Sequence, residues 1–328
     1  MNPVLVLGSN SFSGNSYVWD LAKTTRIIAV SRSKLLSPVL DRLRGSDRVR
    51  NVQFENWNLN DDPGKILKLV LDNDVRTIVN FAAQSMVGQS WDYPEDWYQA
   101  NITSFSKLLN RLHRESKIER FIQFTTPEVY GSTNGWITEN FNFSPNTPYA
   151  ISRAAGDWHL KALFDNYDFP VIFTRAANVY GAGQPLYRII PRVIVSALTE
   201  RKIPLHGGGK SVRSFIHIDD VNRALGEISR YGKAGESYHI STNDLVTIFD
   251  LVEIIARKLN IKLNDLVDIA PDRPGKDFAY QLNSQKIRTE LSWRDSISLS
   301  DGIDRTINWA KENLEELRKM PLDYIHRK

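Results

Sequence analysis

Short apolar, β-forming runs alternate with helix-compatible stretches through the first half of the chain. The runs occupy residues 4–7, 26–30, 77–81, 121–124 and 171–174. Strands that alternate with helices in this way are typical of a parallel sheet with helical crossovers. We therefore predict an α/β fold with a doubly wound parallel sheet, and long helices over residues 94–114 and 149–164.

The pattern becomes irregular after about residue 175. Loop signals interrupt helix-like stretches there, at residues 181–185, 207–209 and 272–275, and the stretches include 248–258 and 302–316. A chain of 328 residues is long enough for two domains at about 150 residues each. We predict a first domain over residues 1–174 and a smaller lobe over 175–328, with a segment of about residues 211–240 returning to the first domain.

Composition excludes several classes of function. The formal net charge is +4, but Lys and Arg are spread along the chain, so no nucleic-acid partner is expected. The absence of cysteine excludes disulfides and thiolate chemistry, and the six histidines lack metal-ligand spacing. We find neither a secretory leader nor an apolar run of the ~18 residues that a membrane span needs. A cytoplasmic protein without a metal is expected.

The first run is followed at once by Gly8-Ser9-Asn10-Ser11-Phe12-Ser13-Gly14. Glycines at a strand-to-helix turn let the backbone approach a pyrophosphate, which the amides at the helix start then hold. Ser11 occupies the place of the middle glycine in the usual three-glycine turn. An ordinary tight turn is the alternative, but its position after the first strand of a βαβ series favours a Rossmann-type dinucleotide site.

The end of the second run reads Val30-Ser31-Arg32-Ser33. Proteins that bind NAD usually place an acidic residue here to bind the ribose 2′-hydroxyl. An arginine and two hydroxyls suit a 2′-phosphate better, so NADP is favoured over NAD, with an ordinary surface role for Arg32 as the alternative. Residues 58–59 and 80–83 lie where further strands should end, at the edge where such sheets bind ligands.

A candidate catalytic group follows the fourth run. Residues 125–131 read TTPEVYG, and Tyr149 and Arg153 lie at the start of the next helix. Residues four apart share one face of a helix. A fixed positive charge beside a phenol favours the phenolate and lowers its pKa, as a base that takes a proton from a sugar hydroxyl requires. Partial burial of an ordinary helical tyrosine is the alternative.

Five ordered blocks carry a family resemblance beyond the glycine turn. They are PEVYG at 127–131, PYAISRAA at 148–155, ANVYGAGQPLYRIIPRVIVSAL at 177–198, GGGKSVRSFIHIDDV at 207–221 and DRPGKDFAY at 272–280. Together with residues 80–85, they make nearly the whole chain resemble the extended short-chain dehydrogenase/reductase family. Within it the chain is most similar to the nucleoside-diphosphate-sugar (NDP-sugar) 4,6-dehydratases, especially the dTDP-glucose type, and also resembles the GDP-mannose type.

The resemblance implies a dehydration cycle. Tyr149 takes the proton of the sugar 4-hydroxyl, steadied by Thr126, while a bound nicotinamide cofactor accepts hydride from carbon 4. Glu128 removes the carbon-5 proton, water leaves carbon 6, and the hydride returns there.

Two residues depart from the family pattern. Arg153 replaces a lysine and cannot relay a proton. Pro127 replaces the aspartate that protonates the leaving water in the dTDP-glucose type. The GDP-mannose type also lacks that aspartate, so Glu128 alone is expected to handle both proton transfers.

The resemblance also implies binding residues and a partner. The expected cofactor contacts are Gly8, Ser11, Phe12, Gly14, Ser31, Arg32, Asn58, Leu59, Ala82, Ala83, Asn101, Tyr149 and Arg153. The expected NDP-sugar contacts are Gln84, Ser85, Asn178, Arg188, Arg213 and Arg273, since guanidinium groups match phosphate oxygens. Family members pair through the two long helices, so a homodimer is expected.

Two other functions stay open. An NDP-sugar 4-epimerase or 4-dehydrogenase needs Tyr149 and the cofactor but no acid to expel water, so it accommodates Pro127 more easily. A non-catalytic dinucleotide sensor is the alternative from another class. The presence of Thr126, Glu128 and Tyr149 speaks against the sensor.

Overall fold

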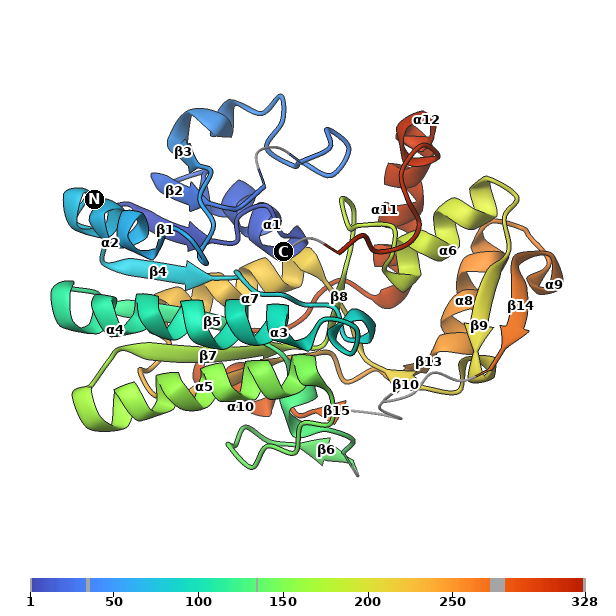
Figure 1. Ribbon diagram of the computed structural model, residues 1–328. Coiled ribbons are helices and arrows are strands. Elements are labelled where there is room, and N and C mark those ends of the chain that lie inside the picture. Colours follow the sequence, from blue (N-terminus) through green and yellow to red (C-terminus); the bar gives the residue numbers. More distant parts are fainter. Residues whose placement is uncertain (1, 34–35, 134, 272–280, 327–328) are drawn as a thin grey trace.

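The computed structural model describes residues 2–33, 36–133, 135–271 and 281–326, and a seven-stranded parallel sheet forms its centre (Figure 1). Its strands, in spatial order, are β12 (Ser237–Ile240), β7 (Val171–Ala176), β5 (Arg120–Thr125), β4 (Thr77–Asn80), β1 (Val4–Leu7), β2 (Ile27–Val30) and β3 (Val52–Glu55). Every neighbouring pair is parallel. The strand order reverses between β1 and β4, the point at which doubly wound sheets bind ligands. The predicted Rossmann-type fold is confirmed.

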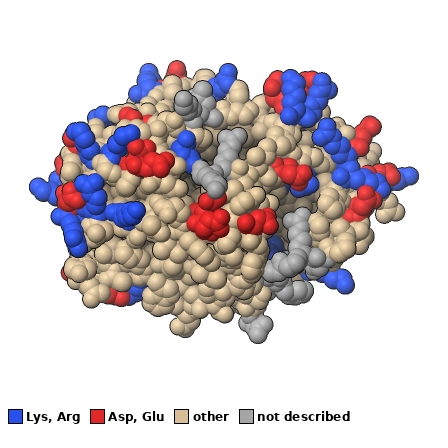
Figure 2. Space-filling view, viewed as in Figure 1, with Lys and Arg blue, Asp and Glu red and all other residues tan. Residues whose placement is uncertain are grey.

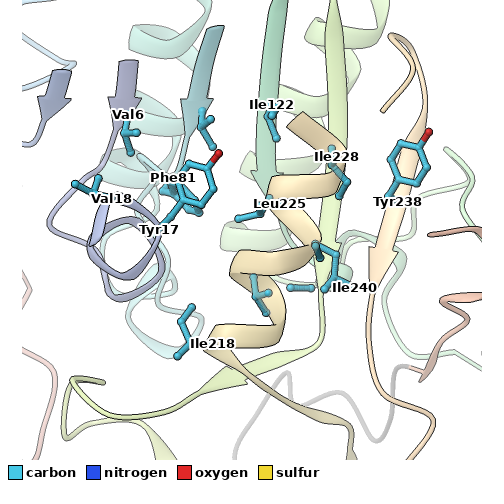
Figure 3. Packing of buried hydrophobic residues seen from close by; sticks show 14 of the residues in the cluster. Val6, Tyr17, Val18, Phe81, Ile122, Ile218, Leu225, Ile228, Tyr238 and Ile240 are labelled. Carbon is cyan, nitrogen blue, oxygen red and sulfur yellow. The ribbon is translucent and has the colours of Figure 1, made fainter. Parts of the chain in front are cut away.

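Helices cover both faces of this sheet because successive strand side chains point to opposite sides. Val6 packs on one face in a cluster with residues of α1 (Phe12–Leu21) and α7 (Ile218–Tyr231), as Figure 3 shows. Leu5 and Leu7 pack on the other face. The helices of that face are α2 (Pro63–Asp72), α4 (Phe105–Glu115) and α5 (Pro148–Tyr167). Burial on both faces explains why these strands are continuously apolar.

The helix predicted over residues 94–114 contains a change of helical type. α3 spans Pro94–Tyr98, a π-helical segment spans Gln99–Ser104, and α4 follows directly. The π-helical segment contains the buried Asn101. Single π-helical turns inside longer helices frequently occur at functional sites.

The smaller lobe has its own core, built from α6 (Ile189–Leu198), α8 (Ile248–Lys258) and α11 (Leu299–Glu312). β9 (Ile203–His206) and β14 (Val267–Ala270) pair in parallel beside it. The remaining elements are β6 (Trp136–Ile137), β8 (Asn178–Tyr180), β10 (Val212–Arg213), β11 (Phe215–His217), β13 (Val246–Thr247), β15 (Gln281–Leu282), α9 (Leu263–Leu266), α10 (Gln285–Glu290) and α12 (Leu314–Leu317). The helix expected over 302–316 is thus two helices, α11 and α12.

The chain returns to the main sheet after its first excursion into the lobe. β8 pairs with β11, α7 then packs on α1, and β12 adds to the sheet beside β7. β11, α7 and β12 lie within residues 211–240, while the predicted division into two domains at residue 174, with this segment returning, stays a prediction. Figure 2 shows Lys and Arg interspersed with Asp and Glu around the rim of the viewed face. Within the described ranges, no helix combines the length and apolar character that crossing a bilayer requires.

Candidate active site

Two cavities meet at the carboxyl ends of the central strands. The first is bordered by the β1–α1 turn and by the segments that follow β2, β3 and β4. The second extends from the β1–α1 turn to the segments that follow β5, β7 and β8. Both are lined by Asn10, Ser11, Phe81 and Ala83, so they form one continuous cleft. Besides Tyr149 and Arg153, nine of the predicted cofactor contacts line this cleft, namely Gly8, Ser11, Phe12, Ser31, Arg32, Asn58, Leu59, Ala82 and Ala83.

The glycine turn is closely packed against its neighbours. Gly8 has a φ of 74°, and a Cβ atom there would lie 2.5 Å from the amide nitrogen of Ala82. A Cβ atom on Gly14 would lie 2.3 Å from the carbonyl oxygen of Gly8. Ser11 is the N-cap of α1, and its hydroxyl accepts a hydrogen bond from the Gly14 amide at 3.1 Å. The turn therefore presents the helix start to the cleft, as a pyrophosphate site requires.

The end of β2 brings a basic residue into the first cavity. Ser31, Arg32 and Ser33 line it, and the described residues of its lining include no Asp or Glu. The Arg32 Nη2 atom donates a hydrogen bond to Gln84 Oε1 at 3.4 Å. Gln84, predicted as a substrate contact, therefore lies in the first cavity beside a predicted cofactor contact. This lining fits a nicotinamide dinucleotide.

Gly14 and Asn101 are the two predicted cofactor contacts that are not among the described residues lining either cavity. Asn101 makes hydrogen bonds within the protein instead. Its Oδ1 atom accepts the Gln84 amide at 2.9 Å, and its Nδ2 atom donates to the Gln84 carbonyl at 3.0 Å and to Ser152 Oγ at 2.9 Å. Asn101 thus braces the loop after β4 against α5.

The predicted catalytic residues Thr126, Glu128, Tyr149 and Arg153 come together in the second cavity. Thr126 caps a short 3₁₀ turn, Pro127–Tyr130, and its hydroxyl accepts the Glu128 amide at 3.3 Å. Proline suits the first position of such a turn, where its fixed φ fits and no amide hydrogen is needed. Pro127 lines the cavity but contributes no acid.

Tyr149 is 8% exposed, and burial raises its pKa above the ordinary value. The Arg153 guanidinium lowers the pKa of Tyr149, the Glu128 carboxylate raises it, and a hydrogen bond with Thr126 lowers it. The effect of Arg153 on the pKa of Tyr149 has the predicted sign, but burial outweighs it, and residue spacing does not reveal burial. Arg153 is itself buried, and its Nη2 atom donates to the Phe124 carbonyl at 2.6 Å.

The other predicted NDP-sugar contacts fall into three groups. Ser85, Asn178 and Arg188 line the second cavity. Arg213 is not among the described lining residues, and its Nη1 atom donates to the Val212 carbonyl at 2.8 Å. Arg273 lies outside the described residues.

The residues that line the second cavity but were not predicted as contacts include Met86, Gln184 and Tyr187. Gln184 is buried, and its Nε2 atom donates to the Val179 carbonyl at 2.7 Å. Each lies beside or within a stretch already singled out, residues 80–85 or 177–198. Their neighbours in the sequence were the available signal, but only the fold shows that they face the same cavity.

The comparison with known families decides the assignment. A family model described as GDP-mannose 4,6 dehydratase matches residues 5–306. This chain belongs to that family. Among curated relatives of this dehydratase, a dTDP-glucose 4,6-dehydratase from Streptomyces niveus is 32% identical and covers 94% of this chain and 93% of the relative. A human dTDP-D-glucose 4,6-dehydratase is 29% identical, with coverage of 97% and 92%.

Solved structures agree with this assignment. DesIV, a dTDP-glucose 4,6-dehydratase from Streptomyces venezuelae with NAD and TYD bound, has a TM-score of 0.90 at 30% identity, covering 97% of this dehydratase and 99% of DesIV. A UDP-glucuronic acid 4-epimerase from Bacillus cereus has a TM-score of 0.84 at 22% identity and shares the fold. The predicted membership of the NDP-sugar 4,6-dehydratases, within the extended short-chain dehydrogenase/reductases, is confirmed.

Proposed function

We propose that this dehydratase converts an NDP-hexose into its 4-keto-6-deoxy derivative, with Glu128 performing both proton transfers of the dehydration. One observation carries the proposal. Among the described residues that line the second cavity, Glu128 is the one acidic side chain, and it lies with Thr126 and Tyr149. Position 127, which holds an aspartate in the dTDP-glucose type, holds a proline.

The cofactor residues fit a nicotinamide dinucleotide, which when bound takes up hydride from carbon 4 and returns it to carbon 6. Gly8, Ser11 and Gly14 would hold its pyrophosphate at the start of α1. NADP is the form we propose, because Ser31 stands where an acidic residue would bind the NAD ribose and Arg32 supplies a positive charge. The NAD bound to DesIV supports the class of cofactor.

Tyr149, in its deprotonated form, accepts the proton of the 4-hydroxyl while the Thr126 hydroxyl holds the same oxygen. Burial disfavours the phenolate of Tyr149, whereas the Arg153 charge and the Thr126 hydrogen bond lower the pKa and so favour it. The 4-ketone then acidifies carbon 5. Glu128 removes that proton and gives a proton to the hydroxyl that leaves carbon 6 as water. A solvent-derived proton finally returns to carbon 5.

The test uses the purified protein, NADP or NAD, and a panel of dTDP-, UDP-, CDP- and GDP-hexoses in deuterated water. Mass spectrometry should show loss of water with one deuterium gained. The Glu128→Gln variant should lose about 100-fold or more of this activity while still reducing the cofactor. Unchanged mass with an altered sugar configuration would instead establish a 4-epimerase, the second candidate, which the proline at 127 favours. Dehydration that survives in Glu128→Gln would reject the role of the glutamate.

We also propose a cytoplasmic homodimer formed through α4 and α5. Ile151 and Trp158 are exposed on α5, and Figure 2 shows a broad area without charged side chains over this helix. Exposed large apolar side chains on a face without charges suit an interaction surface. Analytical ultracentrifugation should give twice the chain mass, and Trp158→Glu should give the monomer. A monomeric unmodified protein would contradict the dimer.

A further inference from the structure

The residues that follow α12 cross between the two lobes. In Figure 1 this dark red segment runs from α12 toward the main sheet. We call residues 321–326 the strap. It contacts α3 of the main domain, and in the smaller lobe it contacts α6 and the segment that enters it, which lines the second cavity.

At the main sheet, the strap docks on α3. His326 Nε2 lies 2.7 Å from Asp96 Oδ2. The His326 ring stacks on Tyr93, with 4.7 Å between centroids and 9° between planes, and on Trp97, at 5.1 Å and 15°. Trp97 is 0% exposed, and the His326 side chain is 13% exposed. The docking is therefore a buried aromatic contact with a charge-assisted hydrogen bond, which is stronger than a surface ion pair.

In the smaller lobe, the strap holds the segment that enters α6. Asp323 Oδ1 lies 3.0 Å from Arg192 Nη2. The Tyr324 ring meets the Tyr187 ring edge-on, with 5.3 Å between centroids. Tyr187 lines the second cavity, and the Arg188 guanidinium lies 5.6 Å from its ring centroid. The strap is thus attached to the cavity wall that carries Arg188.

Another part of the cavity lining precedes, in the chain, the helix on which His326 docks. Ser85 and Met86 line the second cavity and lie in the loop that leads to α3. The strap therefore links the wall that carries Tyr187 and Arg188 to the helix that follows Ser85 and Met86 in the chain. None of its described contacts reaches Thr126, Glu128 or Tyr149.

We propose that the strap fixes the wall formed by Tyr187 and Arg188 relative to α3, and that it thereby sets the affinity of the cleft for the nucleoside diphosphate of the substrate. The proposal rests on the assignment of the second cavity to an NDP-sugar. A wall held in place before binding loses less freedom when the ligand arrives. Once the strap is released, only a fraction of molecules has the wall in place, and apparent affinity falls by that fraction. Tyr324 and His326 are positioning residues that act through Tyr187 and α3.

The experiment compares the unmodified protein with Tyr324→Ala/His326→Ala and with a chain that ends at Leu322. Calorimetry with dTDP, UDP, CDP and GDP needs no turnover and gives Kd directly. For the nucleotide that binds the unmodified protein most tightly, Kd should rise about fivefold or more in both variants. KM for the matching NDP-sugar should rise in parallel, while kcat and the cofactor KM stay unchanged. Ile325→Ala, at a strap position that is 60% exposed, should behave as the unmodified protein.

A separate measurement, the ¹⁹F resonance of Trp97, reports whether the strap is docked on α3. In fluorotryptophan-labelled protein, the ¹⁹F resonance that disappears in Trp97→Phe identifies Trp97 among the eight tryptophans. This resonance should shift in the chain that ends at Leu322. A shifted resonance with unchanged nucleotide Kd would overturn the role of the strap, and an unshifted resonance would overturn its docking. Failure of the unmodified protein to bind any of the four nucleotides would instead overturn the proposed function.

Discussion

Asp157 on α5 and Arg175 on β7 form an ion pair of 2.9 Å in which neither side chain is exposed. Aromatic rings surround the guanidinium, and the Phe143 centroid lies 5.0 Å from it. The pair ties the helix that carries Tyr149 and Arg153 to the central sheet. Removing one partner of such a pair leaves the other charge buried without compensation.

Asp157→Ala should therefore lower the free energy of unfolding by about 3–5 kcal/mol. Urea denaturation followed by circular dichroism measures it. Asp72→Ala breaks the exposed pair with Lys68 and should change stability by less than about 1 kcal/mol. If both variants lost a similar amount of unfolding free energy, burial would not determine how much the Asp157–Arg175 pair contributes to stability.

The dependence of kcat on pH should report on Tyr149. The phenol must lose its proton to act as a base, so kcat rises with pH through the pKa of Tyr149. Arg153 lowers this pKa, and Arg153→Met should therefore move the rising limb to higher pH, by about one unit or more. Arg153→Lys keeps the charge and should leave the limb close to its original position. With saturating cofactor and substrate, an Arg153→Met profile that superimposes on the unmodified one would rule out this electrostatic role.

Cofactor preference should depend on the residues after β2. We expect the unmodified protein to bind NADP about tenfold or more tightly than NAD, since a guanidinium favours the added phosphate. Ser31→Asp/Arg32→Ala should reverse this order, because the carboxylate repels a phosphate and binds a ribose hydroxyl. Fluorescence titration with each dinucleotide gives the two Kd values. Arg50→Ala, at an exposed position away from the cavity, should leave their ratio unchanged.

The brace formed by Asn101 should matter for both stability and cofactor binding. Asn101→Ala removes three hydrogen bonds and leaves buried groups of Gln84 unpaired. The expected cost is about 1–3 kcal/mol of unfolding free energy, together with a higher cofactor Kd, because Gln84 lines the first cavity. Thermal denaturation and dinucleotide titration measure the two effects. Asn110→Ala, at an exposed position on α4, is the matched control. An unchanged cofactor Kd in Asn101→Ala would contradict the prediction.

Much of the sheet could be predicted from the sequence, because strands buried on both faces are continuously apolar. The run at residues 4–7 coincides with β1. A strand was expected to end near residues 58–59, but β3 was not among the predicted runs, since Val52–Glu55 lies at the sheet edge and contains polar residues that remain partly exposed. Local patterning identifies buried strands, whereas an edge strand becomes evident only from its partner.

The candidate site shows the same limit. Spacing alone placed Tyr149 and Arg153 on one helix face, but the pKa of Tyr149 depends on burial by elements distant in the sequence. The π-helical turn around Asn101 and the docking of His326 on α3 also depend on contacts between distant segments. Patterns within a window of a few residues do not contain this information.

The position of β12 has a consequence for protein synthesis. β7 pairs with β5 on one side and with β12 on the other. In a nascent chain, the edge of β7 that faces β12 stays unpaired until residue 240 has left the ribosome. The other strands of the sheet have emerged by then. An open strand edge is a template for pairing with other chains, and late non-local pairing slows folding. Ribosome-bound chains from which β7 has emerged and β12 has not should therefore depend most strongly on chaperones.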